Sequence, residues 1–146
     1  ISIPESNHLD MDVCLRYIDD NDKSVIRYLI SFFKDAKEYG TLLQPENYDY
    51  KGIYDRLKCI EMSNNATLDE YTFFSVYLPI LKDIVKAALM LSKKYTAVCT
   101  NPPYHNKYDK KLEKYVLDNY KEAKADLYSV FIMRDLSFCE KDGFRE

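Results

Sequence analysis

The residues with the clearest chemical potential form a rigid corner at Asn101, Pro102, Pro103 and Tyr104. A residue that precedes proline is pushed out of the helical region of backbone space, and proline itself has a fixed φ and no N–H group. The corner is therefore extended, and its carbonyl oxygens are not tied into a helix. Asn101 adds a side-chain amide with an acceptor oxygen, and Tyr104 adds a flat aromatic face.

This combination suits chemistry at the exocyclic amine of adenine, whose lone pair is delocalised into the ring. Two acceptors facing its two N–H bonds favour the pyramidal amine on which charge develops in the transition state. The side-chain oxygen of Asn101 and the carbonyl oxygen of Pro102 can supply them. Tyr104 can stack on a base taken out of a duplex, with Pro103 and His105 as further substrate contacts, although a lone histidine beside a loop is more often simply exposed. Direct displacement by proximity needs neither a metal nor a covalent enzyme intermediate.

Two other interpretations of the corner stay open. Taken alone, it is more commonly a structural turn at the end of a strand. The pattern Asn-Pro-x-Tyr is also one by which tails bind phosphotyrosine-type domains through β-augmentation. Such signals sit in exposed tails, whereas this corner follows an apolar segment and precedes two helical patterns, which disfavours that interpretation.

The composition bounds the class of protein. The chain has 146 residues, a formal net charge of −3 and 47% apolar residues, enough for a packed core. Only three glycines favour helices over a turn-rich β fold. No segment predicts a transmembrane helix or a signal peptide. The four cysteines form no metal-binding cluster, so we expect no metal site and a cytoplasmic protein with reduced thiols; they are Cys14, Cys59, Cys99 and Cys139.

Apolar periodicity predicts a mainly helical first part, residues 1–94. We expect a helix over 23–39, capped by Asn21 or Asp22 and ended by Gly40, and a short helix over 50–62. A capping-box pattern, Thr67 with Glu70, opens an apolar segment from 68 to about 92. Pro79 must kink this segment or start a second helix.

The pattern changes in the second part, residues 95–146. Residues 95–100 are β-branched and aromatic, which predicts a buried strand that ends at the corner. Amphipathic helices are expected over 109–120 and 122–139, the last of them ended by Asp142 and Gly143.

The segment 96–104 resembles the catalytic motif of N6-adenine DNA methyltransferases, a strand followed by (D/N/S)PP(Y/F/W). The resemblance continues over 112–120 and 125–132, and upstream over 3–7 and 34–40, to PglX-like phage-exclusion and restriction-modification methyltransferases. It implies transfer of a methyl group from S-adenosylmethionine to adenine N6, with double-stranded DNA carrying a flipped adenine as partner. It also implies an α/β (Rossmann-like) methyltransferase domain with a helical insertion. By the same resemblance Phe131 lines the cofactor or base pocket, with packing in the core as an equal alternative.

One departure from that family matters. Its members bind S-adenosylmethionine at a Gly-rich loop after an early strand, and this chain has only Gly40, Gly52 and Gly143. The chain also begins at Ile1 rather than at a methionine. We therefore expect an internal fragment, inactive alone, whose main cofactor loop lies elsewhere. The alternative class is a helical protein-interaction module without catalysis.

Residues 105–124 carry six lysines against four acidic residues. Such a run can contact phosphates near a flipped base. More often it is a solvated helix surface, and the sequence favours that interpretation. The lysines are Lys107, Lys110, Lys111, Lys114, Lys121 and Lys124.

Overall fold

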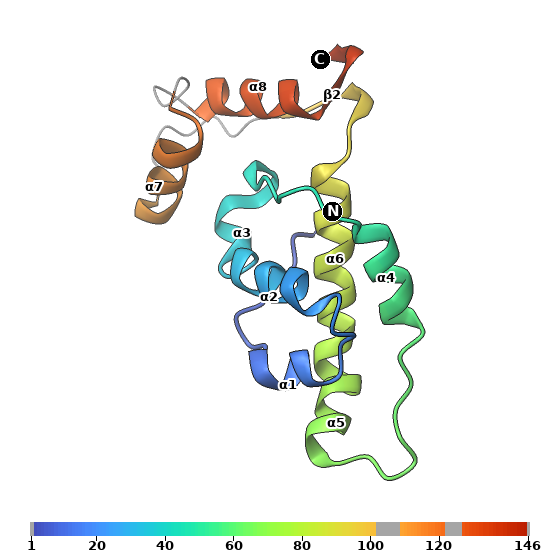
Figure 1. The fold of residues 1–146 in the computed structure, drawn as a ribbon. Helices are drawn as coiled ribbons and strands as arrows, with labels where there is room; N and C mark the ends of the chain where they lie inside the picture. The colour runs from blue at the N-terminus through green and yellow to red at the C-terminus, as the bar shows by residue number, and fades with distance from the viewer. Residues whose placement is uncertain (1, 102–108, 122–126, 146) are drawn as a thin grey trace. The chain divides into compact units, whose positions relative to one another are not determined.

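The computed structural model describes residues 2–101, 109–121 and 127–145, with side chains described as far as residue 140. These residues are mainly helical with one two-stranded sheet (Figure 1), which confirms the predicted mainly α class with minor β. The chain divides into two compact units. The first unit is Ile1–Lys37 with Pro45–Leu91, and the second is Glu38–Gln44 with Ser92–Glu146.

The first unit is built from helices around an apolar core. Its longest helix, α6 (Leu78–Ser92), buries residues on most of its length, as its nearly all-round apolar sequence predicts. The other elements of this unit are α1 (Met11–Arg16), α2 (Lys23–Phe32), the start of α3 (Ala36–Tyr39), α4 (Tyr50–Lys58), α5 (Leu68–Thr72) and the π-helical turn η2 (Phe73–Tyr77).

The predicted single helix over 23–39 is wrong, because the chain breaks it after Phe32. Asp35 has a φ of +54°, outside the helical region. Asn7 stabilises this break from a distance: its side-chain oxygen accepts from the Asp35 backbone N at 2.8 Å, and its amide donates to the Asp35 carboxylate at 3.1 Å. The Ser6 backbone N also bonds the Phe33 carbonyl at 3.2 Å. The apolar residues keep their helical spacing across the break, so the sequence pattern does not reveal the contacts with Asn7 and Ser6.

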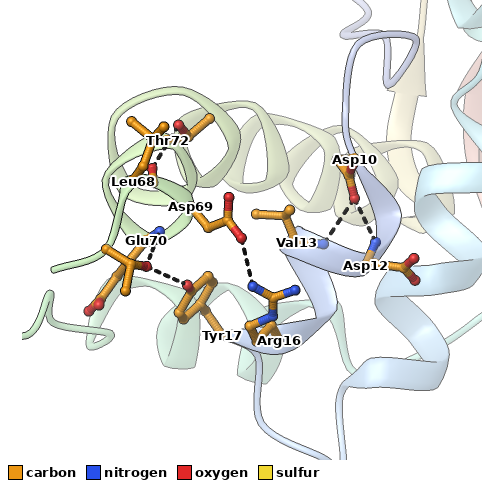
Figure 2. Close-up of polar contacts among 10 residues, drawn as sticks. Asp10, Asp12, Val13, Arg16, Tyr17, Leu68, Asp69, Glu70 and Thr72 are labelled. Atoms are coloured by element: carbon orange, nitrogen blue, oxygen red, sulfur yellow. Dashed lines mark hydrogen bonds and ion pairs between the residues drawn. The ribbon is translucent and has the colours of Figure 1, made fainter.

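Helix α1 was not predicted, since the acidic composition of the first 22 residues hid it. The Asp10 carboxylate caps it by accepting from the backbone N of Asp12 and of Val13, both at 3.0 Å (Figure 2). The helix predicted over 50–62 is shorter than expected, because α4 ends at Lys58. Gly40 has a φ of +56° directly after α3, as predicted for the end of a helix.

Thr67 and Glu70 form the predicted cap at the start of α5, and Glu70 has a second partner. The Thr67 hydroxyl accepts from the Glu70 backbone N at 3.2 Å. The Glu70 carboxylate accepts mainly from Ser63, from its backbone N and its hydroxyl at 2.7 Å each, and its pKa is lowered by these bonds and, to a smaller extent, by the backbone N–H of Thr67. Pro79 starts a second helix, one of the two predicted outcomes: it is the second residue of α6, after η2. A missing N–H is tolerated in a first turn.

The second unit contains a parallel pair of strands joined by helices. Strand β1 (Tyr95–Val98) pairs with β2 (Cys139–Arg145), with Tyr95 opposite Cys139 and Val98 opposite Arg145. The connection carries α7 (Lys110–Asn119) and α8 (Leu127–Phe138), while the turn η1 (Gly40–Leu42) lies in the segment 38–44. Parallel strands require such a crossover connection, and it is the repeating unit of α/β sheets.

Two expectations for this unit are wrong. Residues 139–145 form β2, whereas Asp142 and Gly143 were expected only to end a helix. Strand β1 was expected to be buried over 95–100, but it ends at Val98, and Thr96 and Ala97 are exposed. The first error arises because β2 forms by pairing with a strand more than 40 positions earlier, which leaves little signal in the local sequence. The second arises because β1, among the described residues, pairs with β2 alone and is therefore not covered on both sides.

Candidate active site

Asn101 lies three residues beyond the carboxyl end of β1 and is exposed. In parallel sheets, ligands bind in the crevice outside the carboxyl ends of the strands, so Asn101 stands at the edge where an α/β domain places its reacting groups. The other predicted site residues, Pro102, Pro103, Tyr104 and His105, lie outside the described residues.

The strand that leads to Asn101 is anchored to the end of α8. The Lys94 ammonium donates to the Ser137 carbonyl. The rings of Tyr95 and Phe138 meet edge to face, with centroids 6.1 Å apart. Together with the pairing to β2, these contacts fix the start of β1 on the C-terminal end of α8 and on the strand that follows it.

Helix α8 is held by Arg134, whose residue surface is only 4% exposed. Its guanidinium donates to the carbonyls of Thr41 at 2.9 Å and Leu43 at 2.6 Å, and to the Ser137 hydroxyl at 2.9 Å. The same group lies 3.7 Å from the centre of the Phe138 ring. Burial lowers the pKa of Arg134, yet a guanidinium keeps its charge in proteins. The carbonyl dipoles and the ring therefore take the place of water around a buried cation.

The segment 40–44 completes the apolar cluster of this unit. Leu42 is buried with residues of both helices, and its carbonyl accepts from the Tyr120 hydroxyl at 2.7 Å and the Tyr115 hydroxyl at 3.3 Å. Gln44 donates to the Tyr120 hydroxyl at 2.6 Å. Phe131, which the resemblance places in a cofactor or base pocket, is partly buried against this cluster; its role toward a cofactor stays a prediction. The buried members are Leu42, Val116, Tyr120, Leu127 and Val130.

Arg134 and Tyr120 are the structural supports that sequence reasoning missed. One signal was present for Arg134: it is the single basic residue within α8, a helix whose other residues are mostly apolar. A lone cation in such a helix is either buried with partners or at a functional surface. No local pattern marked Tyr120, because its partners Leu42 and Gln44 lie more than 70 residues earlier.

The described residues hold no group of three or more potential metal-ligating side chains. None of the helices among them is long and apolar enough to span a bilayer.

Two cavities lie among the described residues of the first unit. One of about 480 Å³ is lined in part by Lys37 and Asp83, and one of about 390 Å³ is lined in part by Asp22 and Cys59. Of the glycines, Gly40 ends a helix and Gly52 lies within α4, against its capping residue Asp49. The described residues therefore do not form the Gly-rich loop that would hold S-adenosylmethionine.

The described chain is thus mainly helical, with a short strand that ends three residues before Asn101 and pairs in parallel with β2. Residues 14–145 match the Eco57I restriction-modification methylase family, and with this coverage the chain belongs to that family. The match confirms the resemblance seen at 96–104.

Two curated proteins are similar to the chain. It is 35% identical over 65 residues to "Adenine-specific methyltransferase PglX" of Lacticaseibacillus casei (strain Zhang), covering 43% of this chain and 5% of that protein. It is 23% identical over 131 residues to "Adenine-specific methyltransferase BrxX" of Escherichia coli O9:H4 (strain HS), covering 86% of this chain and 10% of that protein. The chain thus spans a tenth or less of the length of these relatives.

Proposed function

We propose that this chain is part of a longer DNA methyltransferase that transfers a methyl group to adenine N6, in restriction-modification or phage defence. The observation that carries the proposal is the position of Asn101, three residues beyond the carboxyl end of β1, in a chain of the Eco57I methylase family. Residues 1–94 are then a helical region before the catalytic motif. Residues 95–146 contribute a strand–helix–strand unit to a Rossmann-like domain, for which the parallel β1–β2 pair is the supporting feature.

In this proposal the corner binds and orients the target base. The Asn101 side-chain oxygen and the Pro102 carbonyl accept the two N–H groups of the adenine amine. As the amine becomes pyramidal and gains positive charge, both acceptors bind it more strongly, which lowers the barrier. Tyr104 stacks on the base outside the duplex, and Pro103 and His105 line its edge.

The methyl group is supplied by S-adenosylmethionine, as the family in general implies. Because the described residues do not fit a site for this donor, we place its main binding loop in another part of the protein and derive no step through it. The described residues support the reaction indirectly: contacts to α8 hold the start of β1, and the pairing of Val98 with Arg145 holds its end, from which the chain continues to Asn101.

The test is Asn101→Ala in the complete methyltransferase. Loss of one of two acceptors that act in the transition state should lower the methylation rate by about 100-fold or more. Binding of S-adenosylmethionine should be unchanged, as measured by isothermal titration. Asn119→Ala, on α7, is a matched amide control that should keep the rate. Near-normal turnover of the Asn101 variant would refute the assignment.

A further inference from the structure

The charge of the chain is divided unevenly between its two units. The first unit contains ten basic and fourteen acidic residues, whereas the second contains eleven basic and ten acidic residues. The overall acidity of the chain therefore belongs to the first unit. The second unit, which carries the amine-binding corner, has a slight positive excess despite the negative charge of the whole.

Basic side chains of the first unit and two lysines of the second unit also differ in whether they form ion pairs. In the first unit six of the ten basic side chains form ion pairs, among them Arg56 with Asp22 and Lys51 with Asp55. On α7 of the second unit, Lys110 and Lys114 are exposed, and neither forms an ion pair with any residue that the structure describes. They lie one helical turn apart, about 6 Å along the axis, on the same side of the helix.

The opposite side of α7 is committed to packing. Leu112 and Tyr115 are half-buried and Val116 is buried against the Leu42 cluster. This packing fixes which side of the helix faces solvent, and therefore fixes the two lysines on a surface. Glu113 and Asp118 are also exposed on α7, and their negative charges reduce the positive electrostatic potential of the helix. The surface is therefore a pair of lysines and not a broad basic patch.

The position of α7 in the chain limits how far it lies from the target base. Lys110 is nine positions after Asn101, and nine fully extended steps of the chain span at most about 30 Å. One turn of B-DNA is about 34 Å long. A duplex whose adenine reaches Asn101 therefore passes within about one turn of α7.

We propose that Lys110 and Lys114 of α7 contact phosphates of the DNA duplex within about one helical turn of the target adenine. This inference rests on the proposed function and adds to it a DNA-positioning surface outside the corner. Phosphate contacts orient the protein on the duplex without reading its sequence. The sequence alone favoured a solvated surface for these lysines; their shared side, their exposure and their lack of carboxylate partners among the described residues favour a phosphate contact instead.

The experiment compares Lys110→Gln/Lys114→Gln with Lys82→Gln/Lys86→Gln in the complete methyltransferase. The control pair has the same spacing on α6 and removes the same charge from the first unit. Fluorescence anisotropy with a labelled duplex, across a salt series, gives the slope of log affinity against log salt. Each lost phosphate contact lowers this slope by about 0.9, so the α7 variant should lose about 1.8 while the control keeps the wild-type slope.

The outcomes separate this inference from the proposed function. An unchanged slope in the α7 variant, with a wild-type protein that binds and methylates DNA, overturns the inference and leaves the proposed function standing. An equal loss in both double variants also overturns it, since the effect would then be one of net charge. A wild-type protein without affinity for DNA overturns both.

Discussion

The Tyr120 hydroxyl donates to the Leu42 carbonyl at 2.7 Å across 78 residues of chain. Through this bond a short segment from the middle of the helical region becomes part of the unit that contains β1, α7 and α8. The side chain of Leu42 fills the core of that unit while its carbonyl is bound from the side. The side chain and the backbone carbonyl of Leu42 thus both hold the segment 40–44 in this unit.

Tyr120→Phe should lower the free energy of unfolding by about 1 kcal/mol. The ring still fills the buried site, but the Leu42 carbonyl loses its shorter hydrogen bond and Gln44 loses its acceptor. Tyr115→Phe is the matched control, because its hydroxyl contacts the same carbonyl at 3.3 Å from a more exposed position. Urea unfolding followed by circular dichroism measures both, and an equal or larger loss for Tyr115→Phe would contradict the ranking.

Arg134→Met should lower the free energy of unfolding further, by about 3 kcal/mol, because the carbonyls of Thr41 and Leu43 stay buried without their charged donor. Arg134→Lys should recover only part of this, since an ammonium lacks the fork that spans both carbonyls. Lys121→Met, an exposed basic residue after α7, serves as the control and should change stability little. A fully stable Arg134→Met variant would show that the bonds to segment 40–44 are not needed.

Replacing Arg56 by lysine should lower the urea midpoint more than replacing Arg16 by lysine. Arg56 binds both oxygens of the Asp22 carboxylate at 2.7 Å, and that side chain is only 6% exposed. Arg16 makes one contact of the same length with Asp69, where both side chains are about half exposed (Figure 2). Solvent screens the second pair, and a lysine can replace a single contact. Equal midpoints for the two variants would refute the distinction.

Stability should fall at high pH partly through Cys14. Burial, and to a smaller extent the Asp10 carboxylate, raises the pKa of its thiol from 9.0 to about 12. The folded state thus keeps a proton that the unfolded state releases, so this contribution is complete below about pH 9 and is lost as pH rises toward 12. Cys14→Ala should therefore flatten the decline of unfolding free energy above pH 9. An unchanged slope, with Cys59→Ala as the exposed control, would exclude the thiol as its source.

Much of the local structure was predictable from short-range chemistry. The capping hydroxyl of Thr67, the left-handed Gly40, the helix that restarts at Pro79 and the strand before Asn101 all follow from residue types and their neighbours. The corner at 101–104 could be identified as a candidate site for the same reason, because the residues proposed to do the chemistry are four consecutive ones. The role of each corner residue stays a prediction.

The tertiary structure decided the features that depend on distant partners. Asn7 breaks the helix at Asp35, Asp22 leaves its capping role to bind Arg56, and residues 139–145 become a strand by pairing with β1. Each contact joins residues at least 28 positions apart, beyond the reach of helical or strand periodicity. The sequence by itself thus identified the candidate residues for the chemistry and the elements that flank them. Only the folded chain decided what holds those elements, since buried hydrogen-bonding groups choose partners by proximity in space.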